Sequence, residues 1–165
     1  MKRQFPFTTL LLAGCLFAAN SDAASSAPDP REKLGFFAGE WTVKGSEATY
    51  TEKCEWLSKK SFLVCKAQDT DPKDPGTSIS IFGYSPEDQT YTYAGFDSSG
   101  GSRNLRGWFN DKFWVFTGQR ERGTTSPRWQ ITITPTEAGF HFRQDISQNG
   151  AAWATSIEMD YLRAQ

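Results

Sequence analysis

A glycine followed by an aromatic residue recurs every twelve residues in the middle of the chain, at Gly83-Tyr84, Gly95-Phe96 and Gly107-Trp108. Twelve residues is the length of one strand plus one turn. Turn-forming residues follow each dipeptide, and a run rich in aromatic and β-branched residues follows each turn. This pattern is typical of consecutive hairpins in an antiparallel meander.

The rest of the folded part also alternates or clusters like strands, so the sequence predicts an all-β fold. One short helix is expected first, because Asp29 is a capping residue and Pro30 suits the first helical position. About ten strands are expected, at Glu40–Gly45, Thr49–Trp56, Phe62–Ala67, Ser78–Tyr84, Thr90–Phe96, Asn104–Phe109, Lys112–Gly118, Arg128–Thr134, Gly139–Asp145 and Ala152–Leu162.

Consecutive hairpins leave two sheet edges unpaired unless the sheet closes on itself. We therefore predict an antiparallel up-and-down barrel of about ten strands, wide enough to hold a small ligand. An open two-sheet sandwich is the alternative. Gly83, Gly95, Gly107 and Gly118 occupy similar positions in successive strands, which favours a sheet that bends at one level, as closure requires.

The first 24 residues have the pattern of an export signal, with Lys2 and Arg3 before an apolar run and a small-residue cleavage site. Residues 25–30 are expected to form a flexible tether, and residues 31–165 the barrel domain. An alternative is a lipobox ending at Cys15, which would be lipidated and anchor the protein to a membrane. We expect an exported protein, periplasmic or secreted, or else a membrane-anchored lipoprotein.

Charge and length limit the partners and the number of domains. The full chain has 18 basic and 19 acidic residues, and removal of Lys2, Arg3 and Asp22 with the signal leaves 16 and 18, a formal charge of −2. The mature chain therefore has no basic surplus, and nucleic acid is not expected as a partner. The remaining residues, about 140, suit one domain whose core is rich in aromatic side chains.

Cys54 and Cys65 flank the predicted turn Leu57–Lys60, so a hairpin centred between Lys59 and Lys60 places them directly opposite each other. In an oxidising compartment such a pair can be bridged, and we predict a cross-strand disulfide. A redox or metal-binding thiol pair is the alternative. It lacks a further cysteine or a nearby histidine to complete a ligand set, so we expect no metal site.

Several short segments resemble those of known families. The segment Leu34–Trp41 resembles the Gly-x-Trp start of calycins, the superfamily of lipocalins and fatty-acid-binding proteins. The ordered series across the mature chain is more similar to a bacterial family classed only as domain of unknown function family 1579. The resemblance implies a calycin-like barrel and no named chemistry. Its further segments are Cys54-Glu55-Trp56, Phe62–Cys65, Gly83-Tyr84-Ser85, Tyr91-Thr92-Tyr93, Phe96–Gly100, and Asp145-Ile146-Ser147 with Trp153 and Glu158.

Few residues suggest chemistry. The chain has no nucleophile elbow, phosphate loop or zinc spacing. Of the carboxylates that could serve in catalysis, Glu158 is the candidate, because it lies mid-strand between apolar residues, where a carboxylate needs a partner or water. The alternative is that Glu158 points outward. The single histidine, His141, alternates with two phenylalanines, so it is expected on the surface rather than on a haem.

The sequence thus favours a non-enzymatic barrel that binds a small hydrophobic or aromatic molecule, with no cofactor. A protein-interaction or envelope-structural module with a self-filled barrel is the alternative, and an enzyme using Glu158 is a third hypothesis. Aromatic side chains would line the interior, and an arginine or glutamate would bind the polar end of the ligand. The candidate ligand-binding residues are Trp41, Tyr93, Arg106, Trp114, Arg128 and Glu158.

Overall fold

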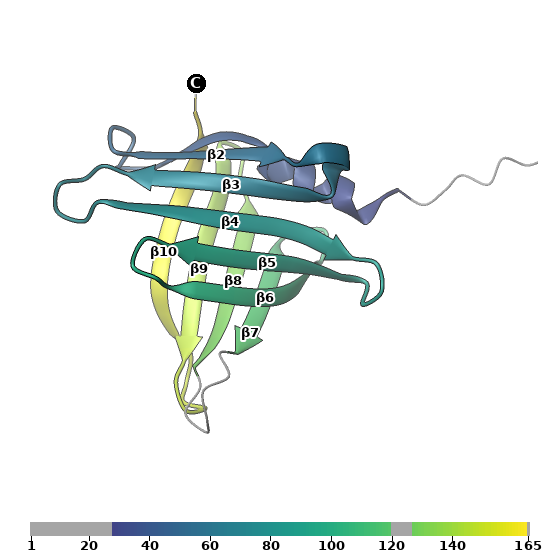
Figure 1. The fold of residues 1–165 in the computed structure, drawn as a ribbon. Coiled ribbons are helices and arrows are strands. Elements are labelled where there is room, and N and C mark those ends of the chain that lie inside the picture. The colour runs from purple at the N-terminus through teal and green to yellow at the C-terminus, as the bar shows by residue number, and fades with distance from the viewer. Residues whose placement is uncertain (1–27, 120–126, 165) are drawn as a thin grey trace, which may run out of the picture.

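The protein forms a closed antiparallel barrel of ten strands in a computed structural model that describes residues 28–119 and 127–164. Consecutive strands pair in order, and β1 pairs with β10 to complete the circle. In Figure 1, β2–β6 lie in front and cross β7–β10 behind them. Closure removes both sheet edges. The predicted barrel is confirmed, and the open sandwich is excluded.

Each predicted strand is present, with ends that differ by two residues at most. The elements are η1 (Pro30–Phe37), β1 (Gly39–Val43), β2 (Tyr50–Trp56), η2 (Ser58–Lys60), β3 (Phe62–Asp69), β4 (Gly76–Ser85), β5 (Thr90–Asp97), β6 (Ser102–Phe109), β7 (Trp114–Gln119), β8 (Arg128–Pro135), β9 (Gly139–Ser147) and β10 (Ala154–Arg163).

The 3₁₀ helix η1 lies across one end of the barrel. The Asp29 side chain accepts a hydrogen bond from the Arg31 backbone N–H at 2.9 Å, which satisfies a free donor of the first turn. Leu34 and Phe37 are buried, and η1 packs against β3 and β4. The Tyr91 hydroxyl donates to the Pro30 carbonyl at 2.9 Å and ties the helix to β5. The helix therefore closes this end of the barrel.

The prediction that four glycines bend the sheet at one level is wrong. In the strand registers Gly83 lies opposite Thr92, and Gly107 lies opposite Tyr91 and Phe116, so the glycines do not form one row. Their roles are separate. At Gly95 an added Cβ would lie 2.9 Å from the Tyr93 hydroxyl, so this glycine makes room for the Tyr93 ring inside the barrel.

The helix-capped end of the interior is filled with aromatic side chains. Phe37 stacks on Phe82 with ring centroids 4.8 Å apart, and Trp114 meets Tyr91 edge-on at 4.7 Å. Phe116 is fully buried beside them. Such rings remove a large apolar area from water, so this end supplies much of the stability of the barrel.

Candidate functional site

A cavity of about 280 Å³ lies in the barrel interior between this aromatic end and the opposite end. Its lining contains both apolar and polar side chains, which suits a molecule that has an apolar body and a polar group. The main apolar side chains are Trp41, Phe82, Ile133, Phe140, Phe142 and Met159. The main polar side chains are Tyr50, Glu52, Tyr93, Arg103, Gln144 and Tyr161.

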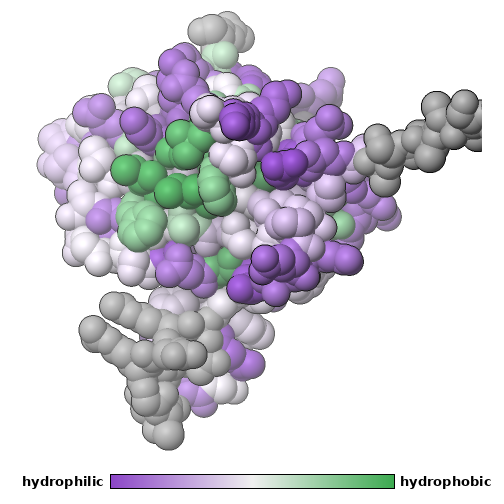
Figure 2. Space-filling model, turned by 45° about the vertical axis from the view of Figure 1, so that its right-hand side comes forward, coloured by the Kyte–Doolittle hydropathy of each residue, from purple (hydrophilic) through white to green (hydrophobic). Residues whose placement is uncertain are grey.

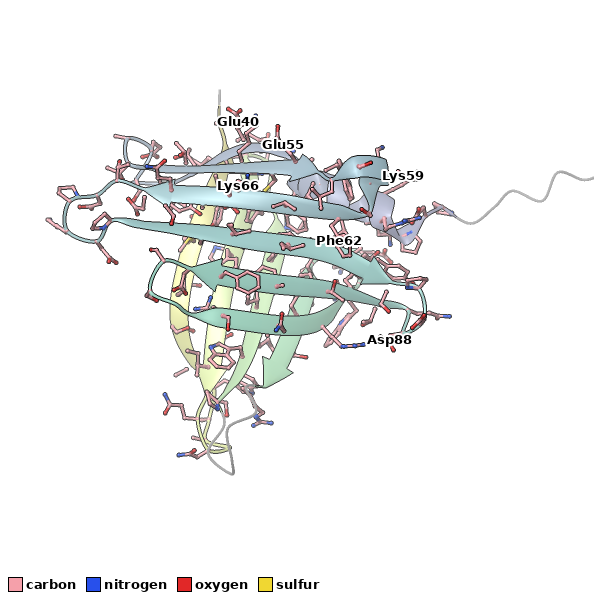
Figure 3. All side chains as sticks on the ribbon, in the orientation of Figure 1. Glu40, Glu55, Lys59, Phe62, Lys66 and Asp88 are labelled. Carbon is pink, nitrogen blue, oxygen red and sulfur yellow. A yellow bond between two sulfur atoms is a disulfide. The ribbon has the colours of Figure 1, made fainter. Side chains whose placement is uncertain are left out.

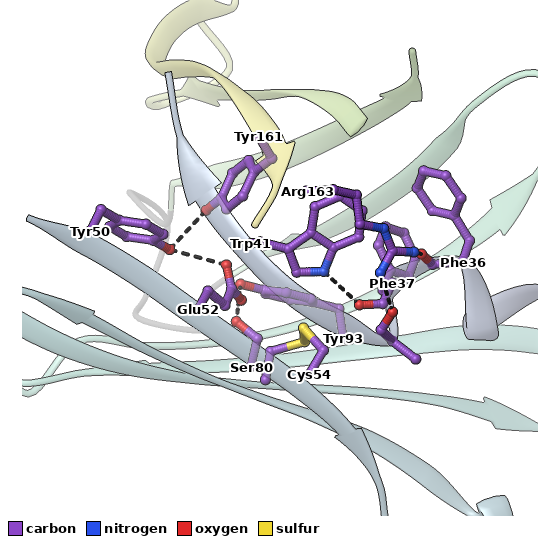
Figure 4. Close-up of a disulfide and its surroundings, with 12 residues drawn as sticks. Phe36, Phe37, Trp41, Tyr50, Glu52, Cys54, Ser80, Tyr93, Tyr161 and Arg163 are labelled. Carbon is purple, nitrogen blue, oxygen red and sulfur yellow. Dashed lines mark hydrogen bonds between the residues drawn. A yellow bond between two sulfur atoms is a disulfide. The ribbon is translucent and has the colours of Figure 1, made fainter. Parts of the chain in front are cut away.

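Glu52 and Asp97 are the carboxyl groups in the lining of this cavity, and phenols surround Glu52 (Figure 4). The Tyr50 hydroxyl donates to Glu52 Oε2 at 3.0 Å and lies 3.1 Å from the Tyr161 hydroxyl. Since Tyr50 has one hydroxyl proton, Tyr161 must be the donor in the second bond. A chain of hydrogen bonds therefore runs from Tyr161 through Tyr50 to Glu52.

Burial is the main electrostatic influence on these groups. It raises the pKa of Glu52, although the hydrogen bond from Tyr50 opposes the change. Burial also raises the pKa values of Tyr50, Tyr93 and Tyr161. The three phenols consequently keep their protons at neutral pH and act as hydrogen-bond donors.

A more open hollow of about 790 Å³ lies over β1–β4 and shares Trp41, Tyr50 and Glu52 with the cavity. Glu52 therefore keeps some accessible surface, even though protein groups desolvate its carboxyl group. Many other side chains around this hollow are exposed, including Lys53 and Lys66. We place the site in the more enclosed cavity, where exclusion of water strengthens polar contacts.

Gln144 on β9 is another polar residue in the lining of the cavity. Its side chain is only 2 % exposed, and its Nε2 donates to Ser156 Oγ at 2.9 Å. Ser156 is the extra residue of a β-bulge between Thr155 and Ile157, and the bulge turns its hydroxyl toward Gln144. Among the residues that the structure describes, Gln144 Oε1 has no hydrogen-bond partner. This oxygen is fully buried, so it is packed against protein atoms rather than open to the cavity, and an unsatisfied buried acceptor is costly.

Arg103 lines the same cavity from β6, and Tyr93 lies within the influence of both charged side chains. Burial is the main cause of the raised pKa of Tyr93, while the charges of Arg103 and Glu52 act on it in opposite directions. The Tyr93 hydroxyl lies 3.1 Å from Ser80 Oγ. The cavity thus carries two acidic side chains, Glu52 and Asp97, and the basic Arg103, with the neutral phenol of Tyr93 near Glu52 and Arg103.

The predicted disulfide between Cys54 and Cys65 is confirmed, with an S–S distance of 2.00 Å. The two residues lie directly opposite each other on β2 and β3, and both line the cavity. Ligand atoms of Glu52 and the two cysteines lie within 4.8 Å of one another. Because each sulfur is already bonded to the other, neither is available as a thiolate ligand, so this cluster does not suit a metal ion.

Two of the predicted ligand-binding residues, Trp41 and Tyr93, line the cavity. Trp41 is buried, and its Nε1 donates to the Phe37 carbonyl at 2.7 Å (Figure 4). Trp114 faces the interior but belongs to the filled aromatic end, where it packs against Phe37 and Tyr91. Of the three aromatic candidates, Trp41 and Tyr93 therefore line the cavity, and Trp114 belongs to the core.

The three charged candidates do not line the cavity, because alternation along their strands places them on the outside. Arg106 pairs with Asp88 across an exposed turn. Arg128 lies over the Trp153 ring, 5.3 Å from its centroid. Glu158 accepts a hydrogen bond from His141 Nε2 at 3.1 Å when that nitrogen carries the proton.

The residues that sequence reasoning missed are Glu52, Arg103 and Gln144. Glu52 had an available signal, because it precedes Cys54 by two positions and so shares its face of β2. Burial of the disulfide would then have indicated an inward carboxyl. Gln144 had the same kind of signal from Phe140 and Phe142 on β9. Arg103 had it too, because it precedes Leu105 by two positions and so shares its face of β6.

The expected signal peptide, residues 1–24, and Cys15 lie outside the described residues. In the part of the chain that the structure covers, no helix has the length and apolar character needed to cross a membrane.

Comparison with known proteins does not assign the chain to a family. No family model matches the chain, and a search of curated proteins finds no match. The resemblance to calycins and to family 1579 therefore stays a prediction, while the barrel itself is established by the structure.

Proposed function

We propose that this protein binds a small molecule inside its barrel, with an apolar body and a polar end, and does not catalyse a reaction. One observation carries the proposal: the cavity of about 280 Å³ combines aromatic walls with a partly desolvated carboxyl group that a phenol hydrogen-bonds. Small-molecule sites typically combine apolar walls with a few convergent polar groups in this way.

The volume of the cavity favours a compact ligand. Each water molecule takes about 30 Å³ of the liquid, and an apolar cavity of about 150 Å³ can hold benzene. A space of about 280 Å³ therefore suits a molecule with one or two rings. Its size also argues against the alternative of a barrel filled entirely by its own side chains.

The groups around Glu52 support binding rather than catalysis. Tyr50 and Tyr161 have raised pKa values, so at neutral pH they stay protonated and do not readily release a proton to a substrate. The enzyme hypothesis used Glu158, but this side chain lies outside and contacts His141. Hydrogen bonding of a ligand is the chemistry that this arrangement supports best.

Mass spectrometry of the protein purified from its native host tests this function. Under native conditions the barrel should carry a small organic molecule that denaturation releases. In Ser80→Trp a large side chain fills the cavity, so the molecule should be lost. The adjacent Ile79 is 41 % exposed, and Ile79→Trp is the matched control that should retain it. An empty wild-type barrel that also takes up no aromatic probe in titration would contradict the proposal.

The alternative role as a protein-interaction module has one observation in its favour. The outer face of β3–β5 carries an apolar area, which Figure 2 shows in green, and Figure 3 labels Phe62 at its edge. Phe62, Ile79 and Phe96 are each more than 40 % exposed. Exposed apolar patches often mark interaction sites. A change of Phe96 to Ser that alters the oligomeric state measured by light scattering would support this role.

We also infer that the folded part works outside the cytoplasm, as the signal pattern predicts. The disulfide supports this location, because such bonds persist mainly in oxidising compartments. Fractionation of the host cells tests it. Cys15→Ala separates the two alternatives, since it should release a lipoprotein from the membrane fraction and leave a soluble exported protein unchanged.

A further inference from the structure

Glu52 gives the cavity an acceptor that can bind further donors. The hydrogen-bond chain from Tyr161 through Tyr50 ends at Glu52 Oε2, and a carboxylate can accept further bonds at both oxygens. A ligand that satisfies Glu52 must therefore supply N–H or O–H groups.

Within the described residues, no lysine, arginine or histidine forms an ion pair with Glu52. Arg103 also lines the cavity, but Glu52 and Arg103 do not form an ion pair. A partly desolvated carboxylate without a counter-ion is less favourable than one in water, so a cation beside Glu52 would be stabilised.

Aromatic rings border the same end. The rings of Phe140 and Tyr161 are stacked with centroids 4.4 Å apart, and Trp41 meets Phe140 edge-on at 4.8 Å. Tyr50 and Tyr161 place their hydroxyl oxygens beside Glu52. Aromatic faces attract a desolvated cation through their quadrupoles. An anion at this place would meet the Glu52 carboxylate and the same negative ring faces.

We propose that the ligand is a small hydrophobic amine, whose protonated nitrogen binds Glu52. Its apolar body lies along Phe82 and Phe140, which line the same cavity. This inference rests on the proposed function and adds the chemical class of the molecule. Glu52 is the residue that distinguishes an amine from a neutral or anionic molecule of the same shape.

The binding of an amine should depend on pH in two steps. Burial raises the pKa of Glu52, so the carboxyl group must lose its proton before it pairs with an ammonium group. The titratable groups facing it are Tyr50 on its own strand and Tyr161 on β10, while Tyr93 on β5 acts from further away. Asp97 on β5 and Arg103 on β6 are the other charged side chains in the lining of the cavity. Affinity should rise through the pKa of Glu52 and fall when the amine loses its proton, near pH 10 for an alkylamine.

Calorimetric titration with three probes of matched shape tests this inference. The probes are 2-phenylethylamine, the neutral 2-phenylethanol and the anionic 3-phenylpropionate. The full mature protein should bind the amine at least about tenfold more tightly than either other probe, because a hydrogen-bonded charge pair is worth that much. Glu52→Gln keeps the size of the side chain and should remove this preference while leaving the affinity for the alcohol within about twofold.

Glu55→Gln is the matched control, because Glu55 lies on the same strand, is exposed and pairs with Lys53 outside the barrel. It should leave all three affinities unchanged, and thermal melting should show that both variants are folded. Equal affinity for the alcohol and the amine, tighter binding of the anion, or an unchanged amine affinity in Glu52→Gln would each overturn the inference and leave the proposed function intact. Failure of all three probes to bind would overturn both.

Discussion

The two ends of the barrel interior differ in what fills them. At the end covered by η1, Phe37, Trp114 and Phe116 pack ring against ring and are almost completely buried. Towards the other end, Glu52 and Gln144 border a cavity of about 280 Å³. Close packing stabilises a fold, whereas a cavity with unsatisfied polar groups lowers its stability. The filled end therefore holds the barrel closed, and the hollow end leaves room for a ligand.

The largest effect is expected at the filled end. Phe116 is fully buried, so Phe116→Ala should lower the free energy of unfolding by about 3–5 kcal/mol through lost burial and a new cavity. Phe142→Ala should cost less, because Phe142 is partly exposed and already borders empty space. Denaturant unfolding measures both values. An equal or larger loss for Phe142→Ala would remove the distinction between the two ends.

The disulfide lies between the two ends and should have the next largest effect. Replacing Cys54 and Cys65 together by alanine should lower the free energy of unfolding by about 2–3 kcal/mol, because the unfolded chain loses a cross-link. The same loss should appear when the wild-type protein is unfolded with a reducing agent. The double variant should not respond to the reducing agent, and a response would show that the effect does not come from this bond.

A smaller effect of opposite sign is expected at the hollow end. Burial raises the pKa of Glu52, so the folded state holds the proton more tightly than the unfolded state. Its contribution to stability is therefore present below the unfolded pKa and is lost as pH rises through the folded pKa. Glu52→Gln should match the wild type at low pH and exceed it by about 1 kcal/mol at high pH.

Urea unfolding at several pH values measures this difference, and Glu55→Gln on the outer face of β2 is the control. If the wild type became more stable than Glu52→Gln as pH rose, the carboxyl group would be favourably ionised in the empty barrel. The contrast between a hollow end that destabilises the empty barrel and a filled end that stabilises it would then be wrong.

The smallest effect is expected on the outer wall. His141 Nδ1 lies 2.8 Å from Asp160 Oδ1, and the hydrogen bond to Asp160 is the main cause of its raised pKa. The pair contributes stability below the ordinary histidine pKa, and this is lost as pH rises through the raised value. Solvent screens such a partly exposed pair, so His141→Ala should cost only about 0.5 kcal/mol at pH 5.5 and less at pH 9. Thermal melting at both pH values, compared with Thr134→Ala, checks this.

Local sequence signals predicted the strands and the disulfide because each depends on neighbouring residues. Alternation along Arg128–Thr134 separated Ile131 and Ile133 from the outward residues, and both isoleucines are buried. The turn between Cys54 and Cys65 placed the cysteines opposite each other before any tertiary contact was known. Period-two alternation and turn geometry are properties of a few consecutive residues, so the sequence displays them directly.

The site was less predictable. Trp41 and Trp114 are both buried aromatic residues on the inner face, yet only Trp41 borders the cavity. Which ring meets empty space depends on η1, since Phe37 lies against Trp114. Glu158 was a candidate because it lies between two apolar residues in sequence. Those neighbours face inward, whereas Glu158 faces His141 on the outside.

The sequence by itself determined that this chain forms a meander of ten strands, and which cysteines pair, because strand alternation and short turns are local. Only the tertiary structure decided that the sheet closes, that η1 fills one end, and that Glu52 and Gln144 from distant strands share one cavity. These features depend on how side chains far apart in sequence divide a common volume. No local pattern specifies where such packing leaves a space.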